Sequence, residues 1–148
     1  MNEYKRRILI TGGAGNIGGA LAARLVADTS NYVVIADNLS TGSLKKLPAR
    51  AAANWRFINL DVNAMHDLGP VMSSNAFDYV FHYAAVVGVK RTLEKPMHVL
   101  ADIDGIRNIL SLAKNTGVKR VFFSSSSEVY GEPFEIPQNE QTTPLNSR

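Results

Sequence analysis

Cysteine is absent from this chain of 148 residues, which excludes a disulfide framework and thiolate metal sites. No apolar run approaches the roughly 20 residues that a membrane-spanning helix needs. The N-terminus also lacks the pattern of a secretory signal, because the basic residues 5–7 lead straight into a short apolar run and then into glycines. We therefore expect a cytoplasmic protein without a membrane span.

Charge of one sign is not concentrated anywhere in the sequence. The formal net charge is +3, but lysine and arginine are scattered, and their one cluster, residues 5–7, flanks an apolar run. Nucleic-acid binding requires a concentrated basic face, so we expect no nucleic-acid partner. The histidines His66, His82 and His98 lack the spacing of metal ligands, and no metal site is predicted. His82 lies in an apolar run and is interpreted as a satisfied core residue.

Short, largely apolar runs alternate with segments of helical periodicity along most of the chain. Strands are expected at Ile8–Thr11, Tyr32–Asp37, Trp55–Leu60, Phe77–Tyr83 and Arg120–Ser125. Helical segments are expected at Ile17–Asp28, Leu44–Ala53, Ala64–Ser73 and Met97–Asn115, the last with Val99, Ile103, Ile106, Leu110 and Ala113 on its buried face. This alternation predicts an α/β fold, a doubly wound parallel sheet with strand order 3-2-1-4-5 and a ligand at the carboxyl ends of its strands.

A glycine-rich turn joins the first predicted strand to the first predicted helix, in the stretch ILITGGAGNIGG at residues 8–19. Gly12, Gly15 and Gly18 satisfy the spacing G-x-x-G-x-x-G. Gly13, Gly15 and Gly18 also satisfy the spacing G-x-G-x-x-G. The unpaired N–H groups and positive dipole end of a helix that begins there would bind phosphate. Such a match is informative only within a βαβ unit that has an acidic residue about 20 positions further on. Asp37, at the end of the next apolar run, meets that condition.

Asp37 is expected to accept hydrogen bonds from both hydroxyls of an adenosine ribose. Its charge would repel a 2′-phosphate, and the next residue is Asn38 rather than arginine, so NAD is favoured over NADP. The alternative, that Asp37 only caps a loop, remains open. Further candidate contacts follow the predicted strands: Ser40, Thr41 and Gly42 after the second, Asp61 and Val62 after the third, and Ala84 and Ala85 after the fourth. The two alanines would equally suit helix packing.

The last part of the sequence differs in composition. From Gly131 onward it contains three prolines and no periodicity, which is typical of a loop. Loops of this length without secondary structure are usually functional or lead to further structure. We expect residues 1–130 to form a dinucleotide-binding domain and residues 131–148 to form a loop that leads away from it.

Taken in order, these segments resemble the extended short-chain dehydrogenase/reductase family, in particular its NAD-dependent nucleotide-sugar epimerases, dehydratases and decarboxylases. The resemblance covers essentially the whole chain and rests on TGGAGNIGG at residues 11–19, DNLSTG at 37–42, DV at 61–62, FHYAA at 81–85 and SSSSEVYG at 124–131. It implies a Rossmann-like fold. It assigns NAD contacts to Gly12, Gly15, Asn16, Ile17, Gly18, Asp37, Asn38, Ser40, Thr41, Gly42, Asp61, Val62, Ala84 and Ala85.

The resemblance also assigns a catalytic hydroxyl to Ser126. In relatives this hydroxyl polarises the C4 hydroxyl of the sugar while a tyrosine removes the proton and a hydride passes to NAD. Ser124 and Ser125 are expected to line the nicotinamide side of the pocket. Glu128 matches a glutamate that acts as an acid or base, or positions the substrate, in dehydratases and decarboxylases, although some epimerase-like members also carry it. Without the family, the serines would fit a polar loop after a strand.

The sequence departs from the family pattern at three points. Asn16 replaces an aromatic residue. Asp102 stands where relatives usually have asparagine; because an ionised aspartate only accepts hydrogen bonds, near a nicotinamide it would either attract the cationic ring or require protonation. The Y-x-x-x-K pair of the family is missing, since no tyrosine here has a lysine four residues later. We therefore expect the N-terminal portion of a longer enzyme, truncated before its catalytic Tyr/Lys helix and sugar-binding domain.

Two functions from different classes are implied by the resemblance. The first is the NAD-binding portion of a nucleotide-sugar epimerase or dehydratase that oxidises the sugar C4 hydroxyl, with a UDP-glucuronate decarboxylase as an alternative. It implies a UDP- or dTDP-sugar substrate and a homodimeric parent, of which this chain alone would be inactive. The second is a non-catalytic domain that binds or senses NAD.

Overall fold

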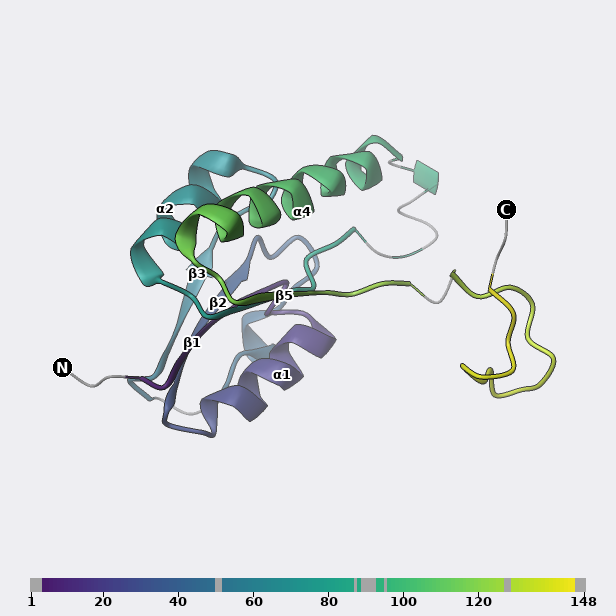
Figure 1. Ribbon diagram of the computed structural model, residues 1–148, viewed down its shortest axis with the longest axis horizontal. Coiled ribbons are helices and arrows are strands. Elements are labelled where there is room, and N and C mark those ends of the chain that lie inside the picture. Colours follow the sequence, from purple (N-terminus) through teal and green to yellow (C-terminus); the bar gives the residue numbers. More distant parts are fainter. Residues whose placement is uncertain are drawn as a thin grey trace.

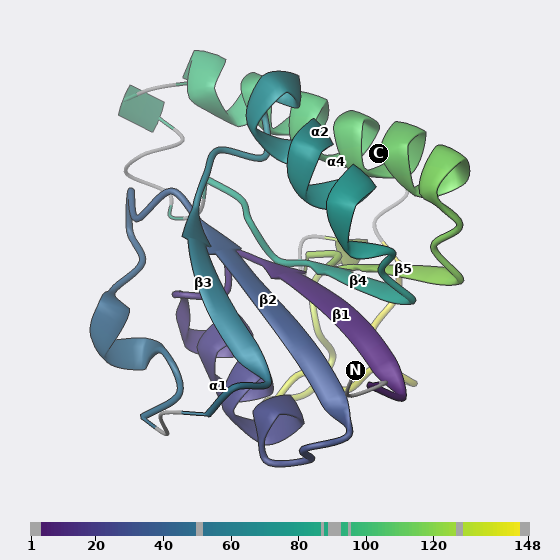
Figure 2. The same ribbon diagram turned by 90° about the vertical axis from the view of Figure 1, so that its left-hand side faces the viewer.

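A five-stranded parallel sheet with the order β3-β2-β1-β4-β5 forms the centre of the molecule (Figures 1 and 2). The computed structural model describes residues 4–49, 52–86, 88, 93–94, 96–126 and 129–145. The strands are β1 (Arg6–Thr11), β2 (Asn31–Asp37), β3 (Trp55–Asn59), β4 (Tyr79–His82) and β5 (Arg120–Phe123). The predicted fold class and strand order are therefore confirmed.

The register brings the carboxyl ends of the strands to one edge of the sheet. Thr11 at the end of β1 pairs with Ala36 of β2 and with His82 of β4. His82 in turn pairs with Phe123 at the end of β5. Residues that come directly after these strands are consequently neighbours in space, although long stretches of sequence separate them.

Helices cover both faces of the sheet (Figures 1 and 2). Helix α1 (Asn16–Val26) lies on one face, whereas α2 (Met65–Asn75) and α4 (Pro96–Thr116) lie together on the other. Gly117 follows α4 with φ +76°, the left-handed conformation in which glycine commonly ends a helix. The layers are those of a doubly wound α/β fold.

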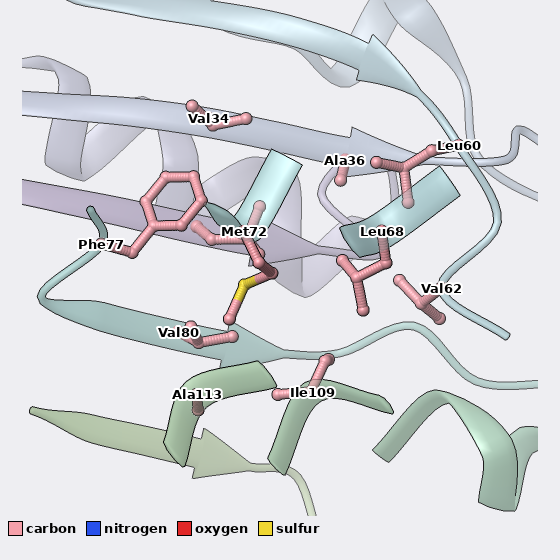
Figure 3. Packing of buried hydrophobic residues seen from close by; sticks show 11 residues of the cluster. Val34, Ala36, Leu60, Val62, Leu68, Met72, Phe77, Val80, Ile109 and Ala113 are labelled. Carbon is pink, nitrogen blue, oxygen red and sulfur yellow. The ribbon is translucent and has the colours of Figure 1, made fainter. Parts of the chain in front are cut away.

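The larger hydrophobic core lies between the sheet and the pair α2 and α4 (Figure 3). Phe77, Leu68, Met72 and Ile109 are fully buried there beside Val34 and the other strand residues. A side chain of this size contributes about 1.5–3 kcal/mol when fully buried. A second cluster, which includes Ile10 and Ile35, lies under α1. Between them, the two clusters hold the carboxyl edge of the sheet in place.

The prediction of a helix over Leu44–Ala53 is wrong for the residues that the structure describes. The structure has only a short 3-10 helix, η1 (Leu44–Lys46), in that region. Leu47 is extended, with φ −68° and ψ 156°, and it precedes Pro48. A proline clashes with a helical residue before it, so the helix cannot continue past Lys46.

The buried face expected for α4 is correct in part. Ala113 is buried and Val99 and Ile106 are half-buried, but Ile103 and Leu110 are 52% and 54% exposed. Asn108 is buried instead, because its side-chain amide donates hydrogen bonds to the carbonyl oxygens of Val62 at 3.1 Å and Asn63 at 3.0 Å. The helix is apolar on two sides, and these polar contacts select the side that faces the sheet.

The segment after β5 folds back on itself, to one side of the sheet (Figure 1). Residues 131–145 contain neither a regular helix nor a strand. An isolated antiparallel bridge joins Tyr130 to Leu145, and the Gly131 N–H donates to the Pro144 carbonyl oxygen at 2.7 Å. The division into a domain of residues 1–130 and a following loop stays a prediction. Within the described residues, no helix is long and apolar enough to cross a membrane.

Candidate dinucleotide site at the carboxyl edge of the sheet

The glycine turn between β1 and α1 packs directly against the segment that comes after β4. Gly12 has φ +67°, and a Cβ atom on it would lie 2.5 Å from the Ala84 nitrogen and 2.6 Å from the Tyr83 carbonyl carbon. A Cβ atom on Gly18 would overlap the carbonyl oxygen of Gly12. Both positions therefore require glycine. Gly13 is crowded as well, because a Cβ atom on it would lie 2.4 Å from Cγ2 of Ile35, so both predicted glycine spacings fit the turn.

Helix α1 presents its N-terminus at this turn. Gly15 is the N-cap residue, and among the described residues no side chain caps the helix there. The first turn also contains no acidic residue. Asn16 and Ile17 begin the helix and are both exposed. Free N–H groups at a helix N-terminus bind anions such as phosphate, so the turn fits the pyrophosphate of a dinucleotide.

Asp37, at the end of β2, is buried beside the turn, with 8% of its surface exposed. Its Oδ2 accepts a hydrogen bond from the Ala14 N–H at 2.9 Å, and its Oδ1 accepts one from the Leu39 N–H at 2.8 Å. A Cβ atom on Gly42 would lie 2.6 Å from Oδ1. Each carboxylate oxygen has a further lone pair, so Asp37 holds the surrounding backbone and can still accept ribose hydroxyls.

The loop after Asp37 lies next to the end of β3. Asn38 donates from Nδ2 to Asp61 Oδ2 at 3.4 Å and accepts the Ser40 N–H on its Oδ1 at 3.0 Å. Ser40 and Thr41 are exposed. Asp61 is half-buried, whereas Val62 packs in the core and offers a ligand only its backbone. The structure thus brings the predicted adenosine-side residues together around Asp37.

The segment after β4 lies on the other side of the glycine turn. The Tyr83 N–H donates to the Thr11 carbonyl oxygen at 3.1 Å, which extends the ladder between β1 and β4. Ala84 is half-buried against the core and Ala85 is exposed. The backbone of this segment approaches Gly12 so closely that residue 12 has no room for a side chain.

The serines at the end of β5 lie beside the end of β4. The Ser124 N–H donates to the His82 carbonyl oxygen at 3.5 Å, and Ser124 and Ser126 are both exposed. The Ser126 carbonyl oxygen accepts the Val129 N–H at 3.2 Å. Glu128 lies outside the described residues, so its predicted role stays a prediction. The predicted nicotinamide-side residues are thus adjacent to the end of β4, as the register requires.

A buried polar contact beneath the site was missed by the sequence reasoning. The Oγ1 atom of Thr11 lies 2.7 Å from Nδ1 of His82, and both side chains are buried. Burial lowers the pKa of His82, while the charge of Asp102 acts in the opposite direction. Asp102 Oδ2 accepts a hydrogen bond from the Val86 N–H at 2.5 Å. The described part of the chain contains no group of three or more His, Asp or Glu residues able to hold a metal ion.

The residues at this edge fit a dinucleotide. A glycine turn that a Cβ atom would fill, a free helix N-terminus and a carboxylate at the end of the next strand are the three elements of such a site. They come from β1, α1 and β2. Comparison with known proteins agrees with this arrangement.

The sequence matches a family model described as the NAD dependent epimerase/dehydratase family over residues 8–148. It is 45% identical over 132 residues to UDP-N-acetyl-alpha-D-glucosaminuronate decarboxylase of Bacillus cytotoxicus, covering 86% of this chain and 39% of that protein. An epimerase structure from Methanothermobacter thermautotrophicus superposes with a TM-score of 0.81 at 32% identity, covering 98% of this chain and 43% of that one.

A further solved structure, the Thermus thermophilus UDP-glucose 4-epimerase in complex with NAD, has a TM-score of 0.80 at 30% identity, covering 95% of this chain and 44% of that one. The chain thus spans about two fifths of the length of these relatives. The prediction of NAD as the cofactor is confirmed for the family. This chain belongs to the NAD dependent epimerase/dehydratase family.

Proposed function

We propose that this chain is the NAD-binding portion of an enzyme that oxidises the C4 hydroxyl of a nucleotide-linked sugar. The observation that carries the proposal is the closed arrangement of the glycine turn, with Gly12 against Ala84 and Asp37 bonded to Ala14. Relatives with the same fold are named as UDP-sugar epimerases and a UDP-sugar decarboxylase. These names favour a UDP-sugar as the substrate.

The residues of this chain divide the work along the carboxyl edge of the sheet. Asp37 binds the adenosine ribose, and the N–H groups at the start of α1 bind the pyrophosphate. When bound, NAD supplies the acceptor for the hydride from the sugar C4 atom. The Ser126 hydroxyl then donates a hydrogen bond to the oxygen on C4 as negative charge develops there. No tyrosine in the sequence has a lysine four residues later, and this proposal assigns no residue of this chain as the base that removes the hydroxyl proton.

Three reactions share this first step and differ in the fate of the C4 ketone. An epimerase returns the hydride to C4 from the other face of the sugar. A dehydratase uses the ketone to eliminate water from the sugar, and a decarboxylase uses it to release CO₂ from a uronic acid. The 45% identity to a UDP-sugar decarboxylase makes that reaction the second candidate. Glu128 belongs to the same proposal, as a residue that positions the substrate or acts as an acid or base.

Product analysis of a parent protein that contains this chain tests the proposal. The parent is incubated with UDP-glucose, UDP-glucuronate and dTDP-glucose, and the products are separated and identified. A C4 epimer identifies an epimerase, a 4-keto sugar that has lost water identifies a dehydratase, and a pentose with released CO₂ identifies a decarboxylase. NAD binding with no turnover of any nucleotide sugar contradicts the proposal and favours a non-catalytic NAD-binding domain.

The exposed side of α4 supports a second proposal, that the parent forms a homodimer. Leu100, Ile103 and Leu110 are 58%, 52% and 54% exposed on that helix. A second copy of the protein would remove this apolar surface from water. Replacement of Ile103 and Leu110 by glutamate is expected to convert a dimeric parent to monomers in sedimentation equilibrium. A parent that is monomeric before the substitution contradicts this proposal.

A further inference from the structure

Helix α4 contacts the segment that comes after β4, and the end of β4 contacts the end of β1. Asp102 of α4 accepts a hydrogen bond from the Val86 N–H at 2.5 Å. Its charge also acts on His82, the last residue of β4, and His82 lies 2.7 Å from Thr11. Thr11 immediately precedes Gly12. The Asp102 side chain is therefore hydrogen-bonded to the backbone of the segment that comes after β4.

The topology determines which half of a dinucleotide lies over this segment. Asp37, at the end of β2, marks the adenosine half, and the glycine turn after β1 marks the pyrophosphate. The strand order reverses between β1 and β4, and a dinucleotide spans the crevice at such a switch point. The nicotinamide half consequently lies over the ends of β4 and β5, where residues 83–86 and 124–126 are found.

The two redox forms of the cofactor differ in charge at this half. The nicotinamide ring is cationic in NAD⁺ and neutral in NADH, whereas the rest of the molecule is unchanged. We propose that Asp102 is a positioning residue that favours the oxidised cofactor: its carboxylate holds the Val86 N–H and makes this site bind NAD⁺ more tightly, relative to NADH, than a neutral side chain would. This inference rests on the proposed NAD-binding function.

Two substitutions on the same helix separate charge from structure. Asp102→Asn keeps the size of the side chain and an oxygen that can accept the Val86 N–H, but it removes the charge. Asp104→Asn removes the same charge two residues away, where the side chain is 52% exposed and pairs with Arg107 at 2.8 Å. Asp102→Glu keeps the charge and alters the geometry. Asp102→Ser provides a second neutral variant in case asparagine is not tolerated.

The experiment measures dissociation constants for NAD⁺ and for NADH separately, by calorimetric titration of the wild-type chain and each variant, with circular dichroism to verify folding. The ratio of the NADH constant to the NAD⁺ constant is expected to fall about threefold to tenfold in Asp102→Asn, because the neutral side chain loses the attraction to the cationic ring. The ratio should stay within about twofold of wild type in Asp104→Asn and in Asp102→Glu.

Each result distinguishes this inference from the function on which it rests. If Asp102→Asn raises the dissociation constants of NAD⁺ and NADH by the same factor, Asp102 has a structural role only and the inference is wrong. The inference is also wrong if neither dissociation constant changes. If the folded wild-type chain binds neither cofactor, the proposed function itself fails, and this inference fails with it.

Discussion

The Ala14 N–H donates to Asp37 Oδ2 at 2.9 Å and thereby joins the glycine turn to the end of β2. The other oxygen of the same carboxylate accepts the Leu39 N–H at 2.8 Å, although Leu39 has a φ of +60° that is unfavourable for a residue with a side chain. One buried carboxylate thus fixes the backbone on both sides of the site. The residue expected to recognise the ribose also shapes the cradle for the pyrophosphate.

Gly12→Ala should disrupt this cradle. The added methyl group would lie 2.5 Å from the Ala84 nitrogen, at a residue with φ +67°. We expect the free energy of unfolding to fall by about 1–3 kcal/mol and NAD⁺ binding to weaken by at least about tenfold. Urea denaturation and calorimetric titration measure the two effects.

Gly69→Ala is the matched control for that substitution. Gly69 lies within α2, and a Cβ atom there would have no neighbour within 4 Å. Alanine is favoured over glycine in a helix, but a Cβ atom directly before Pro70 disfavours the helical conformation. The two effects oppose each other, so the free energy of unfolding of this variant should stay within about 1 kcal/mol of the wild-type value, and NAD⁺ binding should be unchanged. If Gly12→Ala were as stable as Gly69→Ala and bound NAD⁺ as the wild type does, the claim that the turn packs too closely against residue 84 to hold a side chain at position 12 would be wrong.

The parent enzyme should depend on the Ser126 hydroxyl. Ser126→Ala is expected to reduce turnover by about 10²–10³, the usual cost of losing one donor to a developing oxyanion, with little change in NAD⁺ affinity. Steady-state kinetics and cofactor titration of the parent provide the measurements. Ser73→Ala, at an exposed position of α2, serves as the control. Equal turnover in the Ser126→Ala and wild-type enzymes would remove Ser126 from the reaction.

Stability should fall as the pH drops below the range in which His82 is neutral. Burial lowers the pKa of His82 from its ordinary value of 6.5, so the unfolded chain binds a proton at a higher pH than the folded chain does. Stability is therefore fully present above about pH 6.5 and is lost as the pH falls toward the lower pKa of the folded state. Urea denaturation between pH 7.5 and pH 5.5 measures this change.

Two histidine variants test the assignment of that pH dependence. His82→Gln should show a smaller loss of stability on acidification than wild type, whereas His98→Gln should keep the wild-type dependence because His98 is exposed on α4. If the His82→Gln variant lost as much stability as wild type over the same range, another group would be responsible.

Local patterns in the sequence were sufficient to predict the sheet and most of its helices. Most strands are short, largely apolar runs, and the glycines that the turn requires are visible in the spacing of Gly12, Gly13, Gly15 and Gly18. Right-handed connections and the usual order of a doubly wound sheet then predict the strand order. For this reason residues that follow different strands, such as Asp37 and Asp61, could be predicted to lie at the same edge of the sheet.

Features that depend on distant contacts could not be predicted in the same way. The pairing of Thr11 with His82 joins residues 71 positions apart, and nothing local in either segment indicates it. Periodicity showed α4 to be apolar, but the inward side was decided by the Asn108 bonds to Val62 and Asn63. At Leu44–Ala53 the helical periodicity continues past Pro48, but the proline ends the short helix.

The most direct test of the account is a calorimetric titration of the folded chain with NAD⁺, in the wild type and in Asp37→Ala. We predict saturable binding to the wild type and a dissociation constant at least about tenfold higher in Asp37→Ala, because the variant loses the ribose acceptor and the bonds to Ala14 and Leu39. Asp104→Ala, which removes an exposed carboxylate of α4, should bind like the wild type. No binding to the folded wild-type chain, or equal binding by wild type and Asp37→Ala, would contradict the account.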